Sequence, residues 1–172
     1  MDFWETVAAR CSIRRFTAEP VTDEQVQRLL ETAVLAPSAG NRQPWHFVVV
    51  RDKATRTALA AAAYGQGFVA QAPVVIAVCA EAEQSAARYG DRGTHLYCLQ
   101  DTAAATTYIL LGAAALGLGT CWVGAFDEEY AAEVLNLPAR RRPVALIPVG
   151  HLVKQPRRPA RRPLVEVVTR VG

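Results

Sequence analysis

Apolar residues recur at helical spacing in the segment that follows Pro20. The stripe Val26, Leu29, Leu30, Ala33 and Val34 repeats at i, i+3, i+4, i+7 and i+8, which predicts a helix packed on a core. Thr22 and Gln25 have capping-box spacing at its start. Ala36-Pro37 ends it, because the residue before proline disfavours the helical region. The pattern therefore predicts a helix bounded at both ends.

Four further helices are indicated along the chain. Asp2 and Glu5 form a second capping-box pair, which predicts a helix ending near Arg10. Residues 53–64 are alanine-rich, and Asp127 can cap a helix over 128–135. The segment 96–116 is almost free of charge after Asp101, so we expect a helix buried on all sides rather than a membrane span. A partner subunit could supply part of its cover, which favours a homodimer.

Short apolar runs predict strands at 46–50, 73–80, 120–123, 143–149 and 164–168. Residues 81–94 carry no clear period and are expected to form mostly a loop. Helices mixed with a few buried strands indicate an α+β sandwich around a small sheet. The length of 172 residues favours one domain, residues 1–172.

Charge and cysteine usage narrow the possible functions. The net charge is +3, but arginines cluster at 140–142 and 157–162, where they could attract phosphate. A nucleic-acid-binding module is ranked low, because the basic tail is proline-rich and poor in aromatic residues. None of the four cysteines has CxxC spacing, so no metal site is expected. With no signal-peptide core at the N-terminus, a reduced, cytoplasmic protein without membrane association is predicted.

The first candidate for chemistry is the segment RCSIRRF, residues 10–16. Arg10, Ser12 and Arg14 alternate with small or apolar residues directly after a helix. Arginine makes forked hydrogen bonds to phosphate, and serine adds a hydroxyl donor. Taken alone, the segment would be read more readily as a solvated basic loop.

The second candidate is PSAGNRQPW, residues 37–45. Ser38, Ala39 and Gly40 leave the backbone accessible to a ligand, and Asn41 can both donate and accept hydrogen bonds. From the residues alone, ligand binding and turn formation are equally good explanations of Ser38 and Asn41. Trp45 is expected in the core.

Together these segments, with APSAGNRQPWHFVVV (36–50) and GLGTCWVGAF (117–126), resemble the FMN-dependent nitroreductase family, and in particular its short members. The resemblance runs from Arg10 to Leu164. It implies an α+β sandwich with a central mixed sheet flanked by helices. It also implies a homodimer with two FMN sites at the subunit interface, and a C-terminal segment reaching the partner.

The resemblance also assigns residues to the cofactor. Arg10, Ser12 and Arg14 would hold the FMN phosphate, the ribityl chain and one edge of the ring. The residues reaching the flavin from the other subunit would be Pro37, Ser38, Ala39 and Asn41. Gly124 and Ala125 would lie against the flavin, one of them offering a backbone amide to N5. Arg161 matches a basic residue that contacts the phosphate, with Arg158 and Arg162 as alternatives in register.

The implied activity is transfer of hydride from NAD(P)H through FMN to a nitroaromatic, quinone or related acceptor by a ping-pong mechanism. The cofactor performs the chemistry, so no catalytic side chain is required, and Arg14 would act as an electrostatic stabiliser. A flavin-binding protein without turnover is the alternative. The physiological acceptor, the choice of NADH or NADPH, and the role of residues 81–95 stay open.

Overall fold

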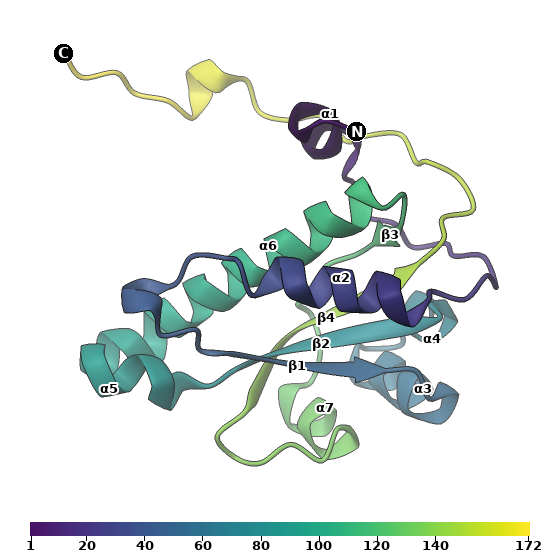
Figure 1. The fold of residues 1–172 in the computed structure, drawn as a ribbon, viewed down its shortest axis with the longest axis horizontal. Coiled ribbons are helices and arrows are strands. Elements are labelled where there is room, and N and C mark those ends of the chain that lie inside the picture. The colour runs from purple at the N-terminus through teal and green to yellow at the C-terminus, as the bar shows by residue number, and fades with distance from the viewer.

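The computed structural model describes residues 1–172 as a four-stranded sheet sandwiched between helices (Figure 1). The strands are β1 (Trp45–Val50), β2 (Val74–Ala80), β3 (Gly119–Thr120) and β4 (Arg142–Gly150), in the order β1-β2-β4-β3. All three strand pairs are antiparallel. The expected mixed character of the sheet is confined to one isolated parallel bridge between Ser12 and Thr120.

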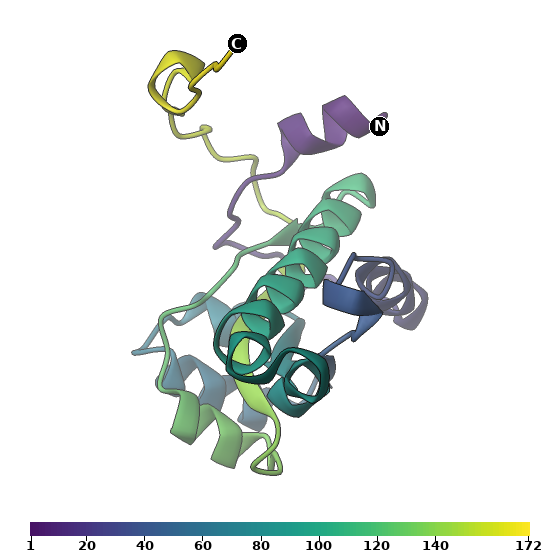
Figure 2. The same cartoon turned by 90° about the vertical axis from the view of Figure 1, so that its left-hand side faces the viewer.

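The helices divide between the two faces of the sheet according to the alternation of side chains in β2 and β4. Helices α2 (Asp23–Ala33) and α6 (Cys98–Ala115) cover one face, packed on Val74, Ile76 and Val78. Helices α3 (Lys53–Ala62), α4 (Phe68–Gln71) and α7 (Glu128–Val134) lie on the opposite side, with Val75 and Ala77 in that cluster. Because every residue of β2 is buried, both faces of the strand are used (Figure 2).

The remaining helices lie at the ends of the molecule. Helix α1 (Phe3–Ala9) precedes the body of the fold. Helix α5 (Ala82–Arg92) continues into the π-helical turn η2 (Gly93–Tyr97). Two single 3₁₀ turns complete the set, η1 (Ala39–Asn41) and η3 (Leu164–Glu166). Both predicted capping boxes form, at Asp2 with Glu5 and at Thr22 with Gln25. Asp127 caps α7 as expected, and Trp45 is buried.

Three expectations from the sequence were wrong. Residues 82–92 are helical, because a polar helix lying on the surface needs only a narrow buried stripe, of which Ser85 is the buried residue. The run 164–168 begins with the 3₁₀ turn η3 and has exposed side chains, since no strand of this chain lies beside it. The predicted strand 120–123 is reduced to β3, and Val123 keeps only an isolated bridge to Leu146.

Helix α6 is less completely covered within the chain than its composition suggested. One face, including Ala105, Ile109 and Ala113, is buried in the core, whereas Ala103, Thr107 and Leu111 remain partly or largely open. None of the helices combines the length and the apolar character needed to cross a bilayer.

Candidate active site

The arginine segment, residues 10–16, runs beside β3 directly after α1. Ser12 pairs with Thr120, and the Ile13 amide donates to the Thr120 carbonyl oxygen at 2.8 Å. Ile13 packs so closely on Gly119 that a Cβ there would lie 2.9 Å from its side chain. In this extended stretch alternate side chains point to opposite faces, so Cys11 and Ile13 are buried while Ser12 and Arg14 are exposed.

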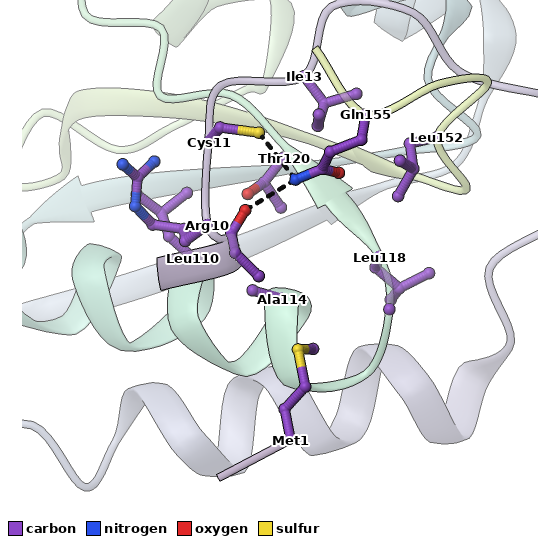
Figure 3. Close-up of a pocket in the computed structure, with 12 residues that line it drawn as sticks. Met1, Arg10, Cys11, Ile13, Leu110, Ala114, Leu118, Thr120, Leu152 and Gln155 are labelled. Carbon is purple, nitrogen blue, oxygen red and sulfur yellow. Dashed lines mark hydrogen bonds between the residues drawn. The ribbon is translucent and has the colours of Figure 1, made fainter. Parts of the chain in front are cut away.

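A hollow of about 230 Å³ lies on the inner side of the arginine segment (Figure 3). Arg10 is the only charged side chain among its lining residues, which include Leu110 and Ala114 from the last turns of α6 and Thr120 from β3. Gln155 closes one side, where its Nε2 donates to the Ala9 carbonyl oxygen at 2.9 Å and to Cys11 Sγ at 3.4 Å. This pair of contacts fixes the point at which the C-terminal tail leaves the body.

On the outer side, Arg14 lies beside the start of α4. Its guanidinium carbon is 5.8 Å from the centre of the Phe68 ring. Burial raises the pKa of the nearby Cys121 thiol, against the opposing effects of the Arg14 charge and a hydrogen bond with Ser12. Cys121 therefore stays a neutral core thiol, and Arg14 is left without a carboxylate partner.

The glycine turn, residues 124–125, is held against the connection between α3 and α4. Gln66 Nε2 donates to the carbonyl oxygens of Ala125 at 3.1 Å and Ala63 at 3.0 Å. The backbone amides of Gly124 and Ala125 donate to no acceptor in the chain, and both residues are exposed. Gln66 contacts the glycine turn, and Phe68, two positions later at the start of α4, contacts Arg14. Residues 66–68 therefore border both Arg14 and the free amides of Gly124 and Ala125. Gln66 was not identified from the sequence, because an isolated glutamine between glycines gives no signal.

The polar turn, residues 37–45, contains three left-handed residues: Gly40, Asn41 and Gln43. Two side-chain contacts stabilise it. Ser38 Oγ accepts a hydrogen bond from the Gln43 amide at 3.0 Å, and Asn41 Oδ1 accepts one from Gln43 Nε2 at 3.2 Å. The turn-forming role of Ser38 and Asn41 is thus present in the structure, and the Asn41 side chain retains its amide hydrogens for another acceptor.

Asp101 is the buried support of the polar turn. Its Oδ1 accepts a hydrogen bond from the Ala39 amide at 3.0 Å, whereas its buried Oδ2 has no partner in the chain. The side chain is 7% exposed, and burial raises the pKa of the carboxyl group despite this hydrogen bond. Sequence reasoning missed this role, although Asp101 is conspicuous as the one acidic residue in an otherwise uncharged helix.

Helix α6 separates the two halves of the candidate site. Asp101, in its first turn, contacts the polar turn, whereas Leu110 and Ala114, in its last turns, face the hollow beside the arginine segment. The 13 residue steps from Asp101 to Ala114 span about 20 Å at the helical rise. Within one chain, therefore, the structure brings the arginine segment close to the glycine turn but leaves Pro37, Ser38, Ala39 and Asn41 at the far end of α6 (Figure 1).

The tail arginines lie outside both halves. Every residue from 153 to 172 is exposed, and the tail extends away from the sheet (Figures 1 and 2). Arg162 forms an ion pair with Glu166 at 3.2 Å, whereas Arg158 and Arg161 have no carboxylate partner. The structure does not bring any of them to the arginine segment of its own chain.

Comparison with known proteins identifies the family. The model of the nitroreductase family matches residues 7–67 and 58–151. An NADH dehydrogenase from Thermus thermophilus is 36% identical over 186 aligned residues, covering 92% of this chain and 91% of the relative. An FMN reductase [NAD(P)H] from Bacillus subtilis is 32% identical over 167, covering 86% of this chain and 66% of the relative.

The fold agrees with this assignment. The crystal structure of a nitroreductase family protein from Streptococcus pneumoniae superimposes with a TM-score of 0.91 at 29% identity, covering 99% of this chain and all of the other. The chain therefore belongs to the nitroreductase family, and the resemblance inferred from its motifs is confirmed. It is accordingly an oxidoreductase of that family.

Proposed function

We propose that the protein is an FMN-dependent oxidoreductase that passes hydride from NAD(P)H to a nitroaromatic, quinone or related acceptor. The observation that carries the proposal is the meeting of the arginine segment and the glycine turn across residues 66–68. There an unpaired guanidinium, a serine hydroxyl and two free amides border one surface. Names of relatives such as the Bacillus FMN reductase support both the flavin and the nicotinamide donor.

The residues present fit an FMN phosphate and an isoalloxazine ring. Arg10 and Arg14 form no ion pair in the chain, so both can meet an anion without first losing a carboxylate partner. Unpaired amides such as those of Gly124 and Ala125 can donate to ring heteroatoms at little desolvation cost, because they are already exposed. We assign Arg10 and Ser12 to the phosphate and ribityl chain, and Arg14 to the ring edge.

Bound FMN would supply the centre that accepts and donates hydride, and the protein residues would orient it and adjust its charge. Arg14 would stabilise the negative charge that develops at the N1 and O2 edge of the ring. The amide of Gly124 or Ala125 would donate to N5 and keep the ring in register. Donor and acceptor would occupy the same exposed face in turn, which gives ping-pong kinetics.

The second half of the site would come from a second copy of the chain. One end of α6 carries the residues of the polar turn assigned to the flavin: Pro37, Ser38, Ala39 and Asn41. The arginine segment lies at the other end. Two α6 helices related by a two-fold axis would therefore bring the polar turn of each chain to the arginine segment of the other and form two complete sites. Exposed apolar side chains are concentrated on α1 and the tail, among them Trp4 at 76% and Val165 at 85% exposure. Such residues are expected to be covered in a homodimer, where Arg161, or its neighbours Arg158 and Arg162, would approach the partner's phosphate site.

An anaerobic absorbance titration tests the proposed function. The purified protein, or protein loaded with added FMN, should show a flavin spectrum that bleaches on addition of NADH or NADPH and recovers on addition of a nitroaromatic or quinone. A flavin spectrum that does not bleach would instead indicate flavin binding without turnover. Protein that fails to retain added FMN would contradict the assignment of the arginine segment.

A further inference from the structure

An arrangement of two arginines and two tyrosines borders the polar turn, and it is called the Arg/Tyr corner: Arg88, Tyr89, Arg92 and Tyr97. The two tyrosine rings are perpendicular with centres 5.1 Å apart. Arg92 Nε donates to Tyr97 Oη at 2.8 Å, and the Arg88 guanidinium carbon is 5.5 Å from the centre of the Tyr89 ring. Each cation is thus held next to an aromatic ring.

Neither guanidinium of the corner is neutralised. No carboxylate oxygen lies within 4.0 Å of Arg88 or Arg92, although Asp91 stands between them in sequence. Arg42 is also without a carboxylate and donates to the Gln84 carbonyl oxygen at 2.7 Å. An unpaired guanidinium presents a planar fork that matches carboxylate, sulfonate and phosphate groups.

The backbone fixes the corner. Gly90 takes a left-handed φ of +53° and reverses the chain between the two arginines. Gly93 packs on the Ser85 carbonyl so tightly that a Cβ would lie 2.5 Å from its oxygen. The positions of the two arginines and two tyrosines are therefore fixed by Gly90 and Gly93, because another residue at either position would be strained or sterically blocked. The side chains of a solvated loop have no such constraint.

The corner also touches the polar turn directly. A Cβ placed on Gly40 would lie 2.5 Å from Tyr89 Oη and 3.2 Å from Arg88 Cδ. Gly40 stands between Ala39 and Asn41, which the proposed function places against the partner's flavin. The Arg/Tyr corner then borders the space in which an acceptor would approach that flavin.

We propose that the Arg/Tyr corner gives the enzyme a preference for aromatic acceptors that carry an anionic group. A tyrosine ring would contact the acceptor ring, and Arg88 and Arg92 would bind its carboxylate or sulfonate. The proposal rests on the proposed function for the position of the flavin, but the anion-binding role of the two arginines is separately measurable.

The test compares 4-nitrobenzoate with nitrobenzene, two acceptors that differ by one carboxylate. FMN-loaded wild type should show the higher kcat/KM for 4-nitrobenzoate. The variant Arg88→Gln/Arg92→Gln should lower that value about tenfold or more, as expected from lost charge-assisted hydrogen bonds. Its kcat/KM for nitrobenzene should change by less than about twofold, because the neutral ring does not use the charges. The variant Arg28→Gln/Lys53→Gln, which removes two exposed cations on α2 and α3, is the matched control and should change neither value.

Calorimetric titration of 4-nitrobenzoate into oxidised, FMN-loaded protein gives a second readout that needs no turnover. Tighter binding to wild type than to Arg88→Gln/Arg92→Gln supports the corner even if reductase activity is absent, in which case the proposed function alone fails. Equal losses of kcat/KM with both acceptors would overturn the proposal. So would a loss of activity that occurs with NADPH as donor but not with NADH. So would binding of 4-nitrobenzoate that the substitutions leave unchanged.

Discussion

The Asp101 carboxylate holds the Ala39 amide at 3.0 Å, and this hydrogen bond fastens the polar turn to the first turn of α6. The second carboxylate oxygen is buried without a partner in the chain. The arrangement combines a favourable charged acceptor with the cost of burying a charge. Asp101 therefore links the stability of the fold to the geometry of a turn that we assign to the flavin.

Substitution of Asp101 separates these two contributions. Asp101→Ala leaves the Ala39 amide unpaired and should lower the free energy of unfolding by about 1–3 kcal/mol. Asp101→Asn keeps a carbonyl acceptor without the buried charge, so it should lie within about 1 kcal/mol of wild type at pH 7. Chemical denaturation of both variants measures the difference. Equal destabilisation by alanine and asparagine would show that the charge itself is required.

The same residue predicts a dependence of stability on pH. The pKa of Asp101 is raised in the folded protein, so the folded state binds its proton more tightly than the unfolded state does. Protonation of Asp101 thus contributes stability at low pH that is lost as the pH rises through its folded pKa. Relative to Asp101→Asn, wild type should gain stability as the pH falls through this range. A difference that stays constant with pH would contradict the prediction.

Gly40→Ala tests the contact between the polar turn and α5. The left-handed φ of +55° alone disfavours alanine by about 1–2 kcal/mol, and the new methyl group would collide with Tyr89 Oη. Removing that oxygen in Gly40→Ala/Tyr89→Phe should restore part of the loss in thermal stability, since only the steric component is relieved. Tyr89→Phe alone is the control. Absence of any rescue would indicate that the backbone conformation accounts for the whole effect.

Gln155→Ala should loosen the tail where it joins the body. The substitution removes the hydrogen bond to Ala9 and the weaker one to Cys11, and a loss of about 0.5–1.5 kcal/mol is expected. Because the tail is proposed to reach the partner, the dimer should dissociate at higher concentrations than wild type in sedimentation equilibrium. The exposed tail substitution Lys154→Ala is the control. An unchanged dissociation constant would uncouple this anchor from assembly.

Arg14→Gln tests the electrostatic role proposed for the arginine segment. Loss of the cation should slow reduction of bound FMN by NAD(P)H by about tenfold or more in stopped-flow measurements, and Arg14→Lys should retain much of the rate. Arg15→Gln removes the neighbouring exposed charge and serves as the control. Equal effects at positions 14 and 15 would mean that the general positive potential, rather than Arg14, is responsible.

Local sequence signals were sufficient to predict those helix ends that are stabilised by residues of the same segment. The capping pairs at Asp2 and Thr22 and the Ala36-Pro37 stop each act on their own helix end without distant partners. Residues 82–92 were missed because their apolar stripe is too narrow to stand out. The tail run 164–168 was misread because apolar alternation does not reveal whether a neighbouring strand exists.

Prediction of the candidate site was limited in a similar way. The motifs around Arg10, Ser38 and Gly124 pointed to the nitroreductase family, and the family comparison confirms that assignment. Asp101 and Gln66 could not be identified, because each acts through a contact far away in sequence: with Ala39 and with Ala125. Such contacts depend on packing that no local pattern records. The assignments of individual residues to the flavin stay predictions.

The placement of the two half-sites at opposite ends of α6 has a consequence for mixed assemblies. If each site takes its arginine segment from one subunit and its polar turn from the other, an Arg14→Gln chain and a chain defective at Asn41 would each be impaired by themselves, for different reasons. A heterodimer of the two would carry both lesions in one site and neither lesion in the other. Co-expression of two disabled chains should therefore restore catalysis by complementation, with one competent site in every mixed dimer.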